Sequence, residues 1–307
     1  MIDTLKKKNF ALRWTVFIRE RFSPLNHFLF NILFFSSNTS IAATCCQLTF
    51  TLGRKEIGSA IVTLFMLFHL RIFDEIKDYE KDQISYPERP LAKGLISVSE
   101  AKQMVTFVIF AELLFSWLIS LRAFSAAFFT LLYSLIMYKE FFRGSWLRQH
   151  PVIYAFTHTF VSSWMSLFVF SAVTRQYFWQ IPKEYGMFLL VNWMLFSIFE
   201  FARKTFAKEE ERDSVDSYSK SSGPFRAALN VILTVTITIY IAIRLGNIFE
   251  SKPIFFILLG LLFAVTLSVS ILYAFFQNIF WAKKFRTVCS IFIVSYSLLV
   301  TFLIRKG

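Results

Sequence analysis

Glycine, proline and cysteine are scarce in this chain, with 9, 7 and 3 copies among 307 residues. A transmembrane β-barrel needs many short alternating strands joined by turns, and so few turn residues argue against one. The three cysteines, Cys45, Cys46 and Cys289, lie in apolar stretches without a CxxC pair or a histidine-rich spacing, which argues against a zinc site. Long uninterrupted helices are the possibility that remains, and the sequence therefore predicts an all-α fold.

Apolar residues, by contrast, make up 56% of the chain, with 40 phenylalanines and a mean hydropathy of +0.54. That is more apolar surface than a soluble core of this size can bury. A helix that crosses about 30 Å of hydrocarbon needs about 20 mostly apolar residues. Nine windows meet or approach this length: residues 27–49, 56–73, 101–121, 123–141, 151–174, 185–203, 225–246, 253–276 and 285–304. We expect a polytopic membrane protein in which residues 27–307 form a domain of nine transmembrane helices.

Residues 1–26 precede the first window and form a separate, cytoplasmic N-terminal segment in this interpretation. Phe10, Trp14, Phe17 and Ile18 recur at helical spacing among basic residues. This pattern indicates an amphipathic helix on the anionic leaflet, although a solvated basic leader has the same composition. Because eight further apolar windows follow, we expect the first window to be retained as a transmembrane helix rather than cleaved as a signal.

The distribution of lysine and arginine predicts the orientation. The chain has 33 basic and 20 acidic residues, and most basic residues lie before the first window or in the loops after the even-numbered windows. Under the positive-inside rule this places the N-terminus in the cytoplasm and, with nine spans, the C-terminus on the opposite side. Since the basic residues are spread among membrane-flanking loops, we interpret them as a topology signal and expect no nucleic-acid partner.

The loop after the second window carries a dense acidic cluster. Asp74, Asp78 and Asp82 recur at every fourth position, and Glu75 lies three before Asp78. On a continued helix these carboxylates would share one face and repel one another. A divalent cation reverses that repulsion, and Mg²⁺, which takes one or two carboxylates together with substrate phosphates and water, fits best. The alternative is a solvated loop whose acids are neutralised by basic neighbours.

The same loop resembles that of a known family. The stretch Asp74-Glu75-Ile-Lys-Asp78-Tyr-Glu-Lys-Asp82, followed by Arg89-Pro-Leu-Ala-Lys-Gly, resembles the first aspartate-rich motif of the UbiA-type intramembrane prenyltransferases, NDxxDxxxD followed by RPLxxG. Asp74 and Glu75 replace the Asn and the first Asp of the motif, and both keep an oxygen ligand. Nine helices with this loop after the second also agree with the family.

The resemblance implies a bundle of nine helices around a lipid-open central cavity, capped by the cytoplasmic loops after helices 2 and 6. The family binds an isoprenyl diphosphate through Mg²⁺ and transfers the prenyl group to an aromatic or other lipophilic acceptor. The implied Mg²⁺ ligands are Asp74, Glu75, Asp78 and Asp82, and Asp78 and Asp82 are the implied catalytic aspartates. The implied diphosphate contacts in this part of the chain are Arg89 and Lys139.

The second charged cluster, after the sixth window, departs from the family. Where another pair of aspartates is expected, this chain has Glu200, Arg203, Lys204 and an acidic run that includes Glu211. In one interpretation, Arg203 and Lys204 contact the diphosphate directly and replace a second metal with fixed positive charge. Glu200 would hold the two cations by its i+3 and i+4 spacing, and Glu200 and Glu211 are the remaining second-motif candidates. In the other interpretation, the site has lost a metal and with it the reaction.

We therefore predict a Mg²⁺-dependent prenyltransferase whose partners are a prenyl diphosphate, a lipophilic acceptor and membrane lipids. The alternative is a catalytically inactive relative that binds isoprenoid or phospholipid headgroups. An ion-coupled transporter would need ionisable residues at mid-membrane and helices broken by glycine or proline. The acids identified above cluster at cytoplasmic helix ends instead, which disfavours transport.

Overall fold

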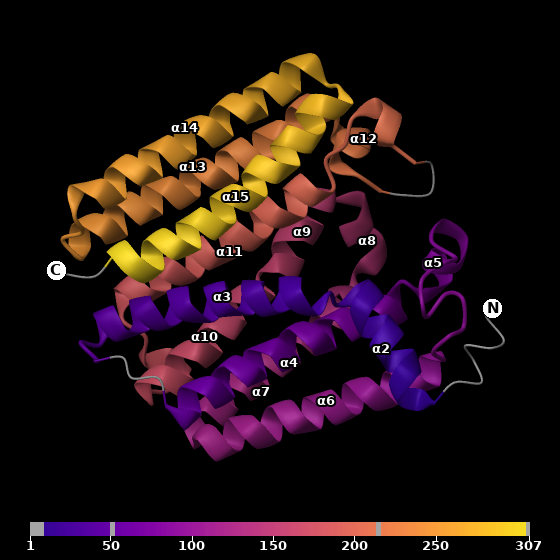
Figure 1. Cartoon of the computed structure of the whole chain (residues 1–307), viewed down its shortest axis with the longest axis horizontal. Helices are drawn as coiled ribbons and strands as arrows, with labels where there is room; N and C mark the ends of the chain where they lie inside the picture. The colour runs from indigo at the N-terminus through magenta and orange to yellow at the C-terminus, as the bar shows by residue number, and fades with distance from the viewer. Residues whose placement is uncertain (1–8, 50–52, 213–215, 305–307) are drawn as a thin grey trace.

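The computed structural model describes residues 9–49, 53–212 and 216–304, and these residues form helices and connecting turns. Within these ranges, nine helical segments are long and apolar enough to cross a membrane, which confirms the predicted fold class. They run roughly along one common direction (Figure 1). In chain order they are α3 (Pro24–Cys45), α4 (Arg54–Lys77), α6 (Val98–Ile119), α7 (Leu121–Tyr138), α9 with α10 (Pro151–Thr159 and Val161–Thr174), α11 (Lys183–Arg203), α13 (Pro224–Ile248), α14 (Pro253–Phe276) and α15 (Ile279–Leu303).

Two spans differ from their apolar windows. The fifth span is divided at Phe160, where the Ser163 amide bonds the Phe160 carbonyl at 3.0 Å in a tighter i→i+3 turn. The last span begins earlier than expected, because the Asn278 side chain accepts a hydrogen bond from the Trp281 amide (3.0 Å) and caps α15 directly after α14. Basic residues such as Arg286, which lie close to the start of the window, are therefore part of the helix.

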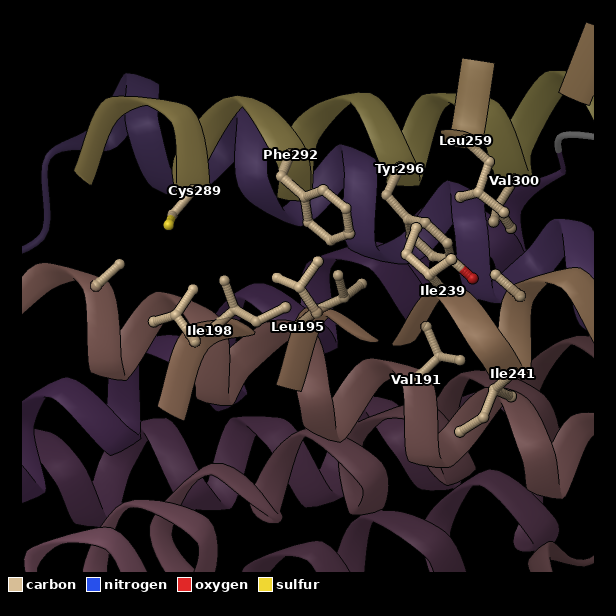
Figure 2. Packing of buried hydrophobic residues seen from close by; sticks show 14 of the residues in the cluster. Val191, Leu195, Ile198, Ile239, Ile241, Leu259, Cys289, Phe292, Tyr296 and Val300 are labelled. Atoms are coloured by element: carbon tan, nitrogen blue, oxygen red, sulfur yellow. The ribbon is translucent and has the colours of Figure 1, made fainter. Parts of the chain in front are cut away.

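The spans pack in the order α3, α4, α6, α7, α10, α11, α13, α14 and α15, and α15 returns to α3. Helix α10 also contacts α3 and α4, and almost all of its side chains are buried. Figure 2 shows the largest apolar cluster, in which Phe292, Tyr296 and Val300 of α15 point toward Val191 and Leu195 of α11. This packing fixes α11, which carries one half of the candidate site.

An ionisable pair that the sequence analysis missed lies inside the bundle. His69 of α4, Glu112 of α6 and Ser134 of α7 are all 0% exposed, with His69 Nδ1 2.6 Å from Glu112 Oε2 and His69 Nε2 3.1 Å from Ser134 Oγ. Ser134 donates its own proton to the Leu131 carbonyl (2.8 Å), so it accepts from Nε2. Glu112 is therefore an acid within a span, in addition to the clustered acids at the helix ends.

Helix α2 (Phe10–Arg21) packs on the membrane domain. Its Trp14 and Phe17 are buried against the C-terminal part of α4 and the start of α6. Arg13 forms an ion pair with Glu100 of α6 at 2.5 Å. A helix is thus present in the N-terminal segment, and the apolar side chains of its buried face contact protein.

Three short helices share one end of the bundle with α2 (Figure 1). They are α5 (Tyr79–Ser85), α8 (Gly144–Gln149) and α12 (Tyr218–Ser222), and they belong to the loops after the second, fourth and sixth spans. The last turn of α15 lies at the opposite end. We refer to the end with α2, α5, α8 and α12 as the loop end. The loops after helices 2 and 6 thus lie at the same end of the bundle.

Candidate functional site

The acidic loop does not continue α4 as one helix. Helix α4 ends at Lys77, Asp78 (φ −89°, ψ 5°) is its C-terminal cap, and α5 begins at Tyr79. The Asp78 amide still bonds the Asp74 carbonyl (2.9 Å), and the Asp78 carbonyl accepts from the Asp82 amide (2.8 Å). The expectation of a single shared face on a continued helix was therefore wrong, and the four acids divide into two pairs.

Glu75 and Asp82 are buried and are held by arginines. Glu75 is 2% exposed and lies 2.7 Å from Arg21 of α2 and 3.8 Å from Arg71. Asp82 is 5% exposed and accepts hydrogen bonds from Arg89 at 2.6 and 2.7 Å. Charge-assisted contacts hold Glu75 Oε1 and both oxygens of Asp82, whereas Glu75 Oε2 is buried without a hydrogen-bond partner among the described residues. The metal-ligand roles of Glu75 and Asp82 and the diphosphate role of Arg89 stay predictions, and those of Asp82 and Arg89 require their ion pair to open.

Asp74 and Asp78 are the acids that remain for a ligand. The Asp74 side chain is half exposed and lies 3.8 Å from Lys77. Burial raises the pKa of Asp78, and the carboxylates of Asp74 and Asp82 act in the same direction, whereas Lys77 and Lys204 act against it. Because the negative charge on Asp78 is not fully compensated, a cation added between Asp74 and Asp78 would be stabilised there.

The C-terminal end of α11 supplies the positive side of the site. Glu200 lies 2.5 Å from Arg203 and 2.7 Å from Lys204. One carboxylate on the preceding turn therefore holds both cations, at the spacing that the sequence suggested. Because Glu200 neutralises only one of the two positive charges, this end of α11 stays net positive.

The acidic and the cationic clusters face each other at the loop end. Lys204 interacts electrostatically with Asp78, and Asp74 interacts with Arg203. Arg71 of α4 also lies within electrostatic reach of both Asp74 and Arg203. The two segments that the sequence marked as functional, separated by more than a hundred residues, thus border one site.

An ion pair joins the two loops beside this site. Lys81 Nζ of α5 lies 2.5 Å from Asp216 Oδ2, in the segment before α12. The hydrogen bond from Lys81 lowers the pKa of Asp216. Since both side chains are exposed, this pair is a surface clasp between the loops and contributes little to global stability.

Two residues of α9 extend the site and were not identified from the sequence. Lys77 Nζ donates a hydrogen bond to the Tyr154 hydroxyl (3.0 Å), and that hydroxyl donates to Glu140 Oε1 (3.3 Å). His158 stacks on Tyr154, with ring centroids 3.9 Å apart, and interacts electrostatically with Lys77 and Asp74. The sequence signal was weak, because a tyrosine and a histidine one turn apart also fit an ordinary packed helix.

Lys139 and Glu211 lie in other surroundings. Lys139 caps the C-terminal end of α7, is exposed, and places its ammonium 5.4 Å from the centroid of the Tyr138 ring. Glu211 accepts hydrogen bonds from Ser217 (2.7 Å) and Ser219 (2.5 Å) and so fixes the start of α12. The diphosphate role of Lys139 and the second-motif role of Glu211 stay predictions.

The carboxylates fit a metal ion that is shared with a ligand. Within the described ranges, no three His, Cys, Asp or Glu side chains come together as a preformed metal site. Mg²⁺, however, commonly binds through one or two carboxylates, with substrate phosphates and water completing its shell. Asp74 and Asp78 provide such a pair. The raised pKa of Asp78 indicates that its negative charge is unfavourable there without an added cation. The residues present therefore fit a Mg²⁺ ion that binds together with a diphosphate.

Several solved structures are similar to this chain in fold. A UbiA homolog from Aeropyrum pernix K1 aligns with a TM-score of 0.64 and 15% identity, over 87% of this chain and 94% of its own. A structure described in a study of digeranylgeranylglyceryl phosphate synthase aligns with a TM-score of 0.62 and 17% identity, over 90% and 97%. A UbiA homolog from Archaeoglobus fulgidus, bound to DMAPP and Mg²⁺, aligns with a TM-score of 0.51 and 13% identity, over 90% and 98%.

Comparison of the sequence with known families identifies the family of this chain more directly than the fold does. No curated protein matches it in sequence. The family model of the UbiA prenyltransferase family, in contrast, matches residues 48–299, which include both charged clusters, seven of the nine spans and most of the last span. With the aspartate-rich loop, the nine-span bundle and this match in agreement, the protein belongs to the UbiA prenyltransferase family.

Proposed function

We propose that the protein is a Mg²⁺-dependent intramembrane prenyltransferase, which transfers an isoprenyl group from a prenyl diphosphate to a lipophilic acceptor. Family and fold support the proposal, as do the A. fulgidus homologs solved with DMAPP and Mg²⁺ and with GPP and Mg²⁺. The observation that carries it is the opposition of Asp74 and Asp78 to Arg203 and Lys204 at one end of the bundle.

In this proposal the diphosphate is held from two sides. Asp74 and Asp78 would hold a Mg²⁺ ion, which would supply positive charge that stabilises the departing pyrophosphate. Arg203 and Lys204 contact the diphosphate oxygens from α11, and Glu200 keeps both side chains in place. Breaking the C1–O bond concentrates negative charge on the pyrophosphate, so these fixed cations lower the barrier to the transition state.

Below the charged layer the interior becomes apolar and aromatic. Phe30 of α3, Leu70 of α4 and Phe196 of α11 are partly buried, and the rings of Phe30 and Phe196 lie 5.4 Å apart. Such side chains suit an isoprenoid tail in a lipid-open central cavity and keep water away from an allylic cation. Aromatic faces also stabilise such a cation through their quadrupoles.

A second candidate function is a catalytically inactive protein that binds isoprenoid or phospholipid headgroups. The observation in its favour is the pairing of Glu75 with Arg21 and of Asp82 with Arg89. These contacts occupy two acids of the motif, while the cations at the end of α11 remain able to bind a phosphate without a metal.

One experiment separates the two functions. Purified protein in lipid nanodiscs receives labelled geranyl diphosphate and a membrane lipid extract, in Mg²⁺ or in EDTA. A transferase binds the diphosphate in a Mg²⁺-dependent manner, releases pyrophosphate and labels an acceptor, and Asp78→Asn and Arg203→Gln abolish the release. The control Glu80→Gln, at an exposed acid of α5, keeps wild-type activity. Metal-independent binding without pyrophosphate release in the wild type identifies the headgroup-binding protein instead.

We further propose that the loop end faces the cytoplasm and that the C-terminus lies on the opposite side, as the distribution of basic residues favours. A cysteine introduced at the exposed Glu209 of this end, in a variant with the native cysteines replaced by serine, tests the orientation. It should react with an impermeant maleimide only after the cells are permeabilised. Labelling of intact cells would reverse the proposed orientation.

A further inference from the structure

His158 of α9 has a ring nitrogen that no protein contact explains. Its Nδ1 lies 2.9 Å from the backbone carbonyl oxygen of Tyr154. A carbonyl oxygen only accepts hydrogen bonds, so Nδ1 carries the proton and donates it. In the neutral ring, Nε2 is then the unprotonated nitrogen and offers a lone pair.

This Nε2 atom is buried and has no hydrogen-bond partner among the described residues. Leaving a buried polar atom unpaired costs free energy, and such an atom in a folded protein therefore calls for a functional explanation. His150 shows that the contact of Nδ1 is itself ordinary, because its Nδ1 also lies 2.9 Å from a carbonyl oxygen, that of Trp146, on an exposed ring. The buried lone pair distinguishes His158.

His158 lies one helical turn, about 5.4 Å along the axis, beyond Tyr154 in α9. Tyr154, in the preceding turn, accepts a hydrogen bond from Lys77, and its ring is stacked on His158 with an angle of 12° between the planes. Phe141 contacts the histidine ring edge to face, with centroids 5.9 Å apart. His158 is therefore one turn farther along α9 than Tyr154, the partner of Lys77, and it interacts electrostatically with Asp74 of the site.

On the basis of the proposed transferase function, we propose that Nε2 of His158 is the base that removes the proton of the acceptor, and that the acceptor carries a hydroxyl group. An O–H group can donate to the unpaired nitrogen before it reacts. In the step, the acceptor oxygen bonds C1, the C1–O bond to the diphosphate breaks, and pyrophosphate leaves with the bonding electron pair. The hydroxyl proton moves to Nε2, so that a prenyl ether and an imidazolium form, and the proton returns to water when the product leaves.

Charged groups from two helices surround His158. Lys77 and Asp74 of α4 and Glu200 of α11 interact electrostatically with its ring. The other titratable neighbours are Tyr154 on the same helix and Glu140, which bonds the Tyr154 hydroxyl.

The test compares His158→Asn with the control His150→Asn in nanodiscs. The probes are labelled geranyl diphosphate, 4-octylphenol as the hydroxyl acceptor, and its methyl ether as an acceptor without that proton. We expect His158→Asn to form prenyl ether about 100-fold more slowly or worse, at the lower end of general-base contributions, with an unchanged Kd for geranyl diphosphate. The acidic limb of the kcat profile should disappear, and added imidazole should restore part of the rate of His158→Ala. His150→Asn should match the wild type.

The possible results are distinct. Wild-type transfer by His158→Asn, or an equal loss of binding and transfer, overturns the role of His158, and prenylation of the methyl ether overturns the hydroxyl acceptor. If the wild type binds geranyl diphosphate with Mg²⁺ but prenylates neither probe, the proposal for His158 fails while diphosphate binding stands. Absence of diphosphate binding in the wild type removes the proposed function and the base together.

Discussion

Asp78 and Asp82 belong to one motif, yet the structure predicts opposite effects on stability when each loses its charge. Asp82→Asn weakens an ion pair in which Arg89 lies 2.6 and 2.7 Å from the two carboxylate oxygens of a residue that is 5% exposed. Asp78→Asn instead removes a carboxylate whose pKa is raised by burial and by neighbouring acids. Asp82 therefore stabilises the fold. The charged form of Asp78 destabilises the fold and is available to bind a cation.

The sign and size of each change in the free energy of unfolding follow from these contacts. Hydrogen bonds to a charged group contribute about 1.5–3 kcal/mol, so Asp82→Asn should lower the free energy of unfolding by about that amount. A raised pKa at Asp78 means that ionisation is less favourable in the folded protein than in the unfolded chain, so stability is lost as the pH rises through the folded pKa. Asp78→Asn should therefore be more stable than the wild type near neutral pH. The gain should shrink as the pH falls toward the ordinary aspartate value of 3.8.

Thermal unfolding in detergent, near neutral and at acidic pH, measures both effects, with the exposed Glu80→Gln as the control. Mg²⁺ and pyrophosphate are then added, because a ligand at 100 times its Kd stabilises the folded state by about 2.7 kcal/mol. The wild type should show this shift and Asp78→Asn should not. Earlier unfolding of Asp78→Asn near neutral pH, or a full ligand shift in that variant, would refute the reasoning. A fully stable Asp82→Asn would remove the role given to Arg89.

Three further predictions concern other parts of the molecule. Glu112→Ala leaves His69 without its buried partner and should destabilise the protein by about 3–5 kcal/mol, whereas Glu112→Gln should recover much of the loss in the same unfolding assay. Lys81→Ala and Asp216→Asn should each change stability by less than about 1 kcal/mol but speed the release of geranyl diphosphate in stopped-flow measurements. Acidification through the lowered pKa of Asp216 should also speed this release, because protonation of Asp216 breaks its ion pair with Lys81. Unchanged release rates would contradict the role of the clasp. Gly223→Ala should lower the unfolding free energy by about 1–3 kcal/mol, since Gly223 has φ 85° and ψ 153°, a backbone region essentially restricted to glycine.

Hydrophobic length alone was enough to predict the nine spans, because in lipid every backbone group must be bonded within its own helix. The ends of the helices were harder to predict. A side-chain cap at Asn278 starts α15 earlier than its apolar window, and a tightened turn at Phe160 divides the fifth span. An average over an apolar window contains neither feature, since caps and local turns depend on single residues at the helix ends.

Within the candidate site, only the local relations could be predicted. The pairing of Glu200 with Lys204 followed from their spacing on one helical turn. Glu75, in contrast, pairs with Arg21 at a separation of 54 residues, and Lys81 pairs with a residue 135 positions away. The sequence therefore identified the acids of the motif, whereas tertiary contacts decide which of them remain available to a cation.

The charge balance of the site predicts how a metal would bind. Four cations lie around the two available acids: Lys77, Arg71, Arg203 and Lys204. They oppose a lone Mg²⁺ ion, but a diphosphate between the acids and the end of α11 would compensate their charge and add oxygen ligands. Mg²⁺ and the diphosphate should therefore bind cooperatively, and each should raise the affinity of the other by the same factor. Isothermal titration with Mg²⁺, with pyrophosphate and with both measures that factor. Tight binding of Mg²⁺ alone, unchanged by pyrophosphate, would mean that the carboxylates form an independent metal site and that the cations of α11 do not share the ligand.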